Sequence, residues 1–348
     1  MARHPAQGLT PARDYFGEVR DAGEAAAQAA GGWIERDLRI AGQAVRLRFA
    51  GPALLEALFP PLAHLAGPAA AEPIVFSLWD SASTGIAFPP VPWSRESLDV
   101  RGQVREEVGP EIVAYHNVHF GGITLYDTAG AAGLYWVESA AVIPWYERGS
   151  PLRTALHLAL PGTNRHLIHA GAVGYAGGGL LIGGRSGSGK STVTLACVED
   201  GFGYAGDDYV LVTLDPPVAH GLYTTAKVNP DGLERLPALG ALVDTAASSP
   251  DKAVLDLSAS AEILLSVPIS AVVIPRVRGD GPTELLPLSA AEAFRALSPS
   301  TVIQMPHRSA EVLETTARLL AAVPSYQLEL GEDLPSAVAL LRDLVGGA

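Results

Sequence analysis

The chain has 348 residues, a length typical of two domains, and hydrophobic residues make up 48% of it against 18% charged residues. This composition is typical of proteins that fold around a core and excludes a chain that is disordered throughout. The net charge of −13, from 37 acidic and 24 basic residues, repels nucleic acid and disfavours DNA or RNA as a partner.

The N-terminal half, residues 31–150, predicts a small β-rich domain of the α+β class. Residues 1–30 precede it and are polar and alanine-rich, which predicts a loose tail or a weak helix. A helical period follows over 51–66 and is broken at Pro60-Pro61. We find no set of residues in this half whose types and spacing indicate a catalytic site. Apolar–polar alternation predicts strands over 34–40, 45–49, 73–79 and 134–137, and two strands within 111–126.

The C-terminal half, residues 151–348, predicts an α/β domain that follows a boundary near 144–152. Its first helix spans 152–160, and a hairpin turning at 176–179 leads into a buried strand at 180–182. Ser289, with Glu292 three residues later, forms the capping box of a helix. We expect further helices over 193–199, 289–297, 309–323 and 334–345, and one strand of the hairpin over 165–175. Further strands are expected over 209–213, 253–257, 269–275 and 326–330, and residues 222–232 predict a strand followed by a turn.

A glycine-rich stretch between the strand at 180–182 and the helix at 193–199 fits the phosphate-loop pattern G-x-x-x-x-G-K-[ST]. The glycines let successive backbone N–H groups point at phosphate oxygens, and the following helix presents its positive N-terminus to the anion. An ordinary glycine turn would explain the glycines but not the lysine and serine after them. The pattern predicts that ATP is bound by Gly184, Arg185, Ser186, Gly187, Ser188, Gly189, Lys190, Ser191 and Thr192.

Within this loop, two side chains have distinct expected roles. Lys190 places a positive charge beside the β- and γ-phosphates, and the Ser191 hydroxyl is a ligand for Mg²⁺. The paired acids Asp207-Asp208 follow Lys190 by 17 and 18 residues. One carboxylate suits Mg²⁺, and the other suits acceptance of a proton from an attacking hydroxyl. A solvated acidic pair at a strand end is the alternative.

We assign the base role to Asp207 and the metal, with Ser191, to Asp208, and we leave the order of the two roles open. The argument is that neighbours on a strand face opposite ways, so that their roles should differ.

The stretch from His169 to Asp208 resembles the C-terminal catalytic domain of HPr kinase/phosphorylase. The resemblance includes the histidine before the hairpin, the phosphate loop, and the sequence Ala205-Gly-Asp207-Asp208. It implies a P-loop kinase core akin to that kinase and to the phosphoenolpyruvate carboxykinases, with ATP, Mg²⁺ and phosphorylation of a serine hydroxyl. It also implies that His169 lies near the transferred phosphate.

The chain departs from this family after about residue 215, where the signature of the phosphorylase reaction is missing. Its layout is similar to a branch that phosphorylates the C-terminal serine of lasso-peptide precursors. We therefore expect a serine kinase that acts on a peptide or protein. A kinase of free serine or a sugar-like alcohol, a nucleotide-dependent regulator without transferase activity, and a genuine HPr kinase/phosphorylase remain alternatives.

Four basic residues after the phosphate loop are further candidates for binding phosphate or the acceptor, namely Lys227, Lys252, Arg276 and Arg278. For each of them taken singly, a solvated surface charge is the favoured interpretation, and the two lysines are the strongest candidates of the four because lysine is scarce in this chain and each lies among small residues.

The remaining features predict a cytoplasmic protein without a membrane partner. No apolar run reaches the ~18 residues that span a bilayer, and the N-terminus lacks the apolar stretch of a secretion signal. The single cysteine, Cys197, excludes an intramolecular disulfide and is expected in the core. A homo-oligomer is compatible with the sequence.

Overall fold

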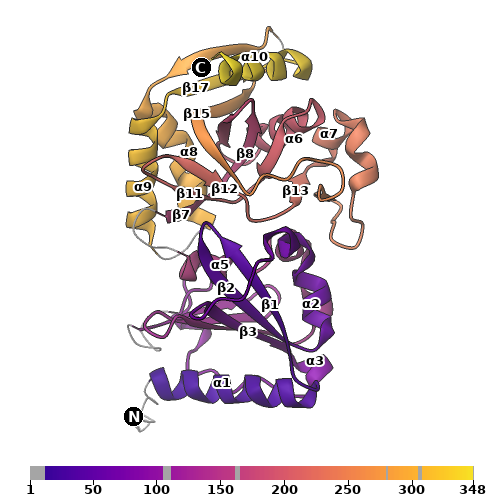
Figure 1. The fold of residues 1–348 in the computed structure, drawn as a ribbon, viewed down its shortest axis with the longest axis vertical. Helices are drawn as coiled ribbons and strands as arrows, with labels where there is room; N and C mark the ends of the chain where they lie inside the picture. Colours follow the sequence, from indigo (N-terminus) through magenta and orange to yellow (C-terminus); the bar gives the residue numbers. More distant parts are fainter. Residues whose placement is uncertain (1–11, 105–110, 161–164, 280, 305–307, 348) are drawn as a thin grey trace, which may run out of the picture. The chain divides into compact units, whose positions relative to one another are not determined.

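The computed structural model describes residues 12–104, 111–160, 165–279, 281–304 and 308–347 and shows a mixed α/β fold with two main sheets (Figure 1). Within these ranges no helix is both long enough and apolar enough to cross a bilayer. The chain forms two compact units. The first unit comprises Met1–Pro60, Ala66–Pro144 and Leu152–Ala159, and the second comprises Pro61–Leu65, Trp145–Pro151 and Leu160–Ala348.

A six-stranded sheet of order β1-β2-β3-β6-β5-β4 forms the centre of the first unit. Strands β2, β3 and β6 run parallel, and the remaining neighbours pair antiparallel. The elements are α1 (Ala12–Ala29), β1 (Trp33–Ile40), β2 (Gln43–Ala50), α2 (Pro52–Leu58), β3 (Ile74–Asp80), α3 (Ser81–Thr84), η2 (Arg95–Ser97), β4 (Ile112–Asn117), β5 (Gly122–Asp127), β6 (Ala132–Val137), η3 (Ala140–Val142) and α5 (Arg153–Ala159).

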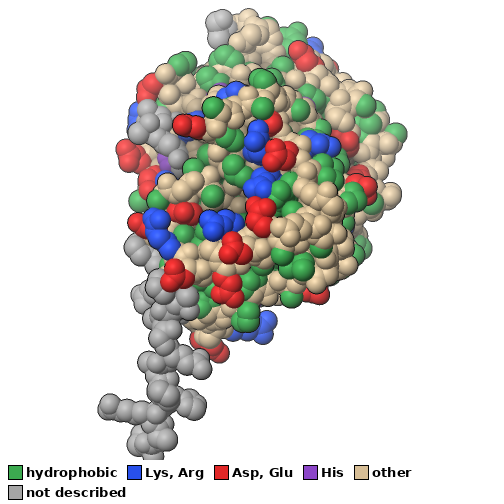
Figure 2. All heavy atoms as spheres, turned by 60° about the horizontal axis from the view of Figure 1, so that its bottom comes forward, with side chains coloured by type: hydrophobic (Ala, Val, Ile, Leu, Met, Phe, Trp, Pro, Cys, Tyr) green, Lys and Arg blue, Asp and Glu red, His purple; other side chains and the backbone are tan. Residues whose placement is uncertain are grey.

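Helix α1 covers one face of this sheet, and α2 and α5 cover the other (Figure 1). Arginines of β2 alternate with apolar residues and form ion pairs, Arg46 with Asp37 at 2.8 Å and Arg48 with Glu24 at 3.1 Å. Figure 2 shows acidic and basic side chains intermingled on the face drawn there. The alternation seen in the sequence therefore reflects one apolar and one charged strand face.

The larger sheet of the second unit has the order β10-β8-β9-β15-β12-β11-β7. Strand β15 is long enough to pair with β12 at its start and with β17 at its end, and β16 pairs with β17. Strands β13 and β14 pair separately. The strands are β7 (Arg165–Ile168), β8 (Ala170–Tyr175), β9 (Gly178–Gly183), β10 (Gly203–Gly206), β11 (Val210–Thr213), β12 (Val218–His220), β13 (Thr225–Val228), β14 (Ala253–Asp256), β15 (Ser266–Val277), β16 (Glu284–Leu288) and β17 (Ser325–Leu330).

Helices cover both faces of this sheet. Successive residues of a strand point to opposite sides, and in the buried strands both sides are apolar, so each face packs against helices. On β9, Leu180 and Ile182 contact the core under α6 and α10, whereas Leu181 belongs to the core under α8 and α9. The helices are η1 (Pro60–Leu65), α4 (Trp145–Arg148), α6 (Lys190–Glu199), α7 (Pro230–Glu234), η4 (Pro237–Leu242), α8 (Ala290–Gln304), α9 (Ser309–Ala322) and α10 (Leu334–Gly346).

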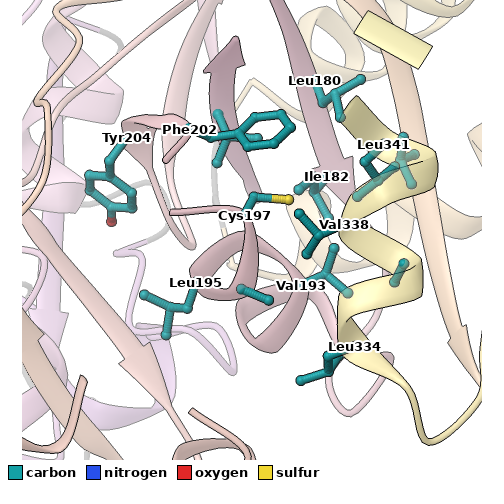
Figure 3. Packing of buried hydrophobic residues seen from close by; sticks show 14 of the residues in the cluster. Leu180, Ile182, Val193, Leu195, Cys197, Phe202, Tyr204, Leu334, Val338 and Leu341 are labelled. Atoms are coloured by element: carbon teal, nitrogen blue, oxygen red, sulfur yellow. The ribbon is translucent and has the colours of Figure 1, made fainter. Parts of the chain in front are cut away.

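Cys197 of α6 lies in the first of these cores, between β9 and α10 (Figure 3). Its side chain is fully buried, together with Ile182, Phe202 and Leu341. Burial of a large apolar side chain contributes about 1.5–3 kcal/mol, so this core fixes the helix that follows the phosphate loop. The prediction of a core cysteine is confirmed.

The structure adds elements that the sequence patterns did not show. Strands β12 and β16 are short or exposed, and their patterns are too weak to be recognised. Helix α8 continues to Gln304 although Pro299 lies inside it, which extends it beyond the predicted end at 297. The alanine-rich N-terminal segment forms α1 from Ala12 onward, and the start of the predicted tail lies outside the described residues.

Candidate active site

The phosphate loop connects the last residue of β9, Gly183, to the first residue of α6, Lys190. Its glycines take left-handed backbone angles, with φ of 140° at Gly184, 79° at Gly187 and 94° at Gly189. A Cβ at Gly189 would lie 2.8 Å from Leu330 Cδ1. Glycine is therefore favoured there by its backbone angle, and the Leu330 side chain of β17 packs closely against it.

The loop residues differ in exposure. Arg185, Ser186 and Gly187 form an exposed tip, and Ser191 is half-buried at the start of α6. Thr192 is buried, and its Oγ1 would lie 2.8 Å from a Cβ placed at Gly232 of α7. Thr192 therefore packs against α7. The hydroxyl of Ser188 is buried without a hydrogen-bond partner within the described residues, as expected of a group placed to meet a ligand.

Lys190 is buried, with its Nζ 2.8 Å from Oδ1 of Asp208 and 3.7 Å from Oδ1 of Asp207. Burial alone would lower the pKa of Lys190, but the charges of Asp208 and Asp207 outweigh it and raise the pKa above its ordinary value. The lysine is therefore positively charged in the site at every physiological pH.

The two acids lie in a bend between β10, which ends at Gly206, and β11, which begins at Val210. Asp208 has a φ of 64°, and the N–H of Tyr209 donates to the carbonyl of Asp207 at 2.8 Å. Such a left-handed position costs of order 1–3 kcal/mol for a residue with a side chain. The expectation that the acids face opposite sides of a strand was wrong, because the bend directs both carboxylates toward Lys190.

Asp208 lies among three nitrogen groups. Besides Lys190, the Nζ of Lys227 lies 3.5 Å from its Oδ2, and the Nε2 of His169 lies 3.4 Å from its Oδ1. Burial would raise the pKa of Asp208, but the charge of Lys190, the hydrogen bond from His169 and the charge of Lys227 hold the pKa well below its usual range. The side chain remains 20% exposed, so it is accessible from solvent.

The Asp207 carboxylate is fully buried. Its Oδ2 accepts a hydrogen bond from the backbone N–H of Lys227 at 3.2 Å. Its Oδ1 has no hydrogen-bond partner within the described residues and faces Lys190. A buried carboxylate oxygen with spare acceptor capacity suits a cation.

His169 precedes β8 and is buried beside Tyr209, with 5.4 Å between ring centroids. Its backbone N–H donates to Thr301 Oγ1 at 3.1 Å. Burial, and next the charge of Lys190, lower the pKa of His169, although Asp208 opposes them. The imidazole is therefore neutral at pH 7.

Helix α8 supplies residues that sequence reasoning missed. Ser300 donates to the carbonyl of Gly184 at 3.4 Å. The amide nitrogen of Gln304 lies 3.5 Å from both ring nitrogens of His169, and its oxygen accepts a hydrogen bond from the Tyr209 hydroxyl. No local pattern in the sequence marks these residues, because their partners lie far away along the chain.

Among the four basic candidates, the structure places Lys227 in the site. Arg276 and Arg278 pair with Glu329 at 3.6 and 3.4 Å and keep side chains that are 62% and 54% exposed. Lys252 lies in the turn before β14.

The donor set fits a magnesium–nucleotide complex. The Ser191 hydroxyl and the two carboxylates are hard oxygen donors, and Mg²⁺ in nucleotide sites uses one or two carboxylates together with phosphate oxygens and water. Among the described residues no cluster of three or more His, Cys, Asp or Glu side chains is placed to hold a metal ion.

Comparisons with known proteins give a partial structural likeness. No protein-family model matches the chain, and no curated protein matches it. The structure of the Hpr(Ser) kinase/phosphatase from Coxiella burnetii is similar to part of the chain, with a TM-score of 0.30 and 12% sequence identity. This match covers 52% of the present chain and 89% of the other.

Proposed function

We propose that the chain is a serine kinase, which transfers the γ-phosphate of ATP to a serine hydroxyl of a peptide or protein. The observation that carries the proposal is the 2.8 Å contact between Lys190 of the phosphate loop and Asp208, with His169 against the same carboxylate. A phosphate-binding lysine thus lies beside a carboxylate that can take a proton. We also propose that the second unit has a P-loop core of the HPr kinase and phosphoenolpyruvate carboxykinase type.

In this mechanism the loop amides and Lys190 bind the β- and γ-phosphates. Ser191 and one carboxylate would hold Mg²⁺, which when bound neutralises charge on the phosphate oxygens. The exposed fractions of the two acids favour one assignment of these roles. Asp208 is 20% exposed and Asp207 is fully buried, so Asp208 is the carboxylate that an acceptor hydroxyl can reach. We therefore assign proton acceptance to Asp208 and the metal to Asp207, which reverses the order first favoured from the sequence.

His169 contributes a neutral ring beside Oδ1 of Asp208. Because its pKa is lowered, it adds no charge near Asp208 at pH 7 and can donate or accept one hydrogen bond there. Binding of ATP would attract Lys190 toward phosphate and away from Asp208. The pKa of Asp208 would then rise, which makes the carboxylate a better proton acceptor.

The test uses the purified chain with Mg²⁺ and ATP labelled at the γ-phosphate. Acceptors are a lasso-type precursor peptide with a C-terminal serine, the same peptide ending in alanine, free serine, and HPr. Label on the serine peptide alone supports the proposal. Label on free serine would identify a small-molecule kinase, and label on HPr would identify an HPr kinase. ADP release without a labelled acceptor would favour a nucleotide-dependent regulator. Lys190→Ala should remove the transfer in each case.

A further inference from the structure

Lysine is rare in this chain, and its positions are informative. Three of the 24 basic residues are lysines, at 190, 227 and 252, and the others are arginines. Two of these three contact the same carboxylate from different oxygens, Lys190 at Oδ1 and Lys227 at Oδ2 of Asp208. A lysine presents a compact charge on a flexible stem, whereas arginine presents a planar fork, so the two are not interchangeable at a reacting centre.

The ammonium group of Lys227 is held by its surroundings. The residue is 5% exposed, and its Nζ donates to the hydroxyl of Ser150 at 2.6 Å. The same nitrogen lies 5.6 Å from the ring centroid of Tyr209, which adds a cation–π contact. Its backbone N–H binds Asp207. A buried charge fixed at this many points is oriented before any ligand arrives.

Ser150 belongs to a segment, Trp145–Pro151, that packs with the second unit against β13. Thr225 donates to the carbonyl of Gly149 at 2.5 Å, and the Tyr223 hydroxyl donates to the carbonyl of Pro151 at 3.0 Å. A Cβ at Gly149 would lie 2.8 Å from Cε of Lys227. The segment therefore lies directly on the stem of Lys227.

We propose that Lys227 is a second catalytic lysine, which binds the phosphoryl group during transfer, and that Ser150 positions it. This inference rests on the proposed kinase function. In the transfer, the bond from the acceptor oxygen to the γ-phosphorus forms and the bond to the β,γ-bridging oxygen breaks. ADP leaves with that electron pair, and the hydroxyl proton goes to Asp208. Lys190, at Oδ1 of Asp208, binds the phosphates of the nucleotide. Lys227, at Oδ2 of Asp208, binds the transferring phosphoryl group on the side of the acceptor hydroxyl.

Proximity is tested without measuring activity. A biotin acyl-phosphate derivative of ATP acylates lysines that lie near its phosphates, and the modified residues are mapped by mass spectrometry. We expect labelling of Lys190 and Lys227 that excess ATP suppresses, and none of Lys252. Labelling of Lys190 alone would overturn the assignment of Lys227. Absence of labelling at Lys190 would contradict the nucleotide site itself.

Kinetics separate the two lysines further. Lys227→Met should lower kcat on the order of 100-fold or more while the Kd for ATP changes little, because the lost charge acts on the transferring group. Lys227→Arg should recover part of kcat. Ser150→Ala should lower kcat less than Lys227→Met does, and Lys252→Met is the matched control that keeps full activity.

A structural role of Lys227 would give a different result. In that case Lys227→Met would lower the melting temperature and leave the kcat of the folded fraction unchanged, which would overturn the inference. Loss of transfer in Lys190→Ala combined with normal transfer in Lys227→Met would also refute it while leaving the kinase proposal intact. If neither variant affected transfer, the proposed function would be wrong.

Discussion

Nζ of Lys190 lies 2.8 Å from Oδ1 of Asp208, 18 residues further along the chain. The contact joins the phosphate loop to the bend after β10 and pairs the buried lysine with a carboxylate that is 20% exposed. In the proposed kinase, the phosphates of ATP would compete with Asp208 for the lysine. Nucleotide binding and activation of the carboxylate would then be coupled through one ion pair.

Replacing Lys190 tests its expected role in transfer and its contribution to stability. Lys190→Met should lower transfer by ~10²–10³ or more, because a charge that stabilises the phosphates is lost. It should also lower the free energy of unfolding by ~3–5 kcal/mol, because the Asp207 carboxylate stays fully buried after Lys190, the cation beside it, is removed. Steady-state kinetics and urea denaturation measure the two effects. Arg318→Met, which removes an exposed pair with Asp215, is the control and should cost less than ~1 kcal/mol.

The two acids should respond differently to amide substitution. Asp208→Asn should abolish transfer while ATP still binds, because it removes the proton acceptor and also a negative charge beside the phosphates. Asp207→Asn should weaken the binding of Mg²⁺, so that a higher Mg²⁺ concentration is needed for transfer. It should also lower the stability of the fold, because the carboxylate of Asp207 accepts the N–H of Lys227 in a buried position. Isothermal titration with Mg·ATP and transfer assays distinguish them. Loss of nucleotide binding in Asp208→Asn, with binding retained in Asp207→Asn, would return the roles to the original order.

Stability should decrease as the pH falls below about 6.5, through buried histidines. Burial lowers the pKa of His166 and leaves it neutral in the folded chain, whereas the unfolded chain takes up a proton. A group with a lowered folded pKa contributes stability above its unfolded pKa, and this is lost as the pH falls through the folded value. The slope per group approaches about 1.4 kcal/mol per pH unit. The same direction holds for His64, His116, His169 and His220.

Denaturation at pH 7.5, 6.5 and 5.5 measures this slope. His166→Gln should flatten it by up to one group's share. An equal slope in the His166 variant and the unmodified chain would contradict the expectation.

Cys197 should serve as a reporter of unfolding. Burial, and next the charge of Asp200, raise the pKa of its thiol to about 12, so little thiolate exists at pH 8. The side chain is also fully buried (Figure 3). A thiol-specific disulfide reagent should therefore react only when the core opens, with rates that increase with urea. Reaction at the rate of an exposed cysteine in native buffer would show that α6 is not packed as described.

Local patterns predicted the strands and helices of both halves well, because periodicity and glycine or proline breaks are properties of neighbouring residues. The phosphate loop was recognised for the same reason. The strand period failed at Asp207 and Asp208, since the left-handed backbone of Asp208 is invisible in the sequence. Scarcity of lysine directed attention to Lys227, and the structure places it at Asp208.

Contacts between distant segments could not be predicted. Ser150 meets Lys227 across 77 residues, and Gln304 meets His169 across 135. Neither serine nor glutamine stands in a motif at these positions, so only the folded chain brings them to the site. Helix α8 reaches His169 because it continues through Pro299, where a sequence rule would end it.

The segment Trp145–Pro151 also limits how the chain can be divided. It belongs with the second unit, although Leu152–Ala159 of the first unit follows it in sequence. A fragment that begins at residue 152 or 160 would lack Gly149 and Ser150, and Lys227 would lose its hydroxyl partner. Grafting or truncating the second unit therefore requires this segment to be carried along with it, either in its natural connection or through a linker that replaces 152–159.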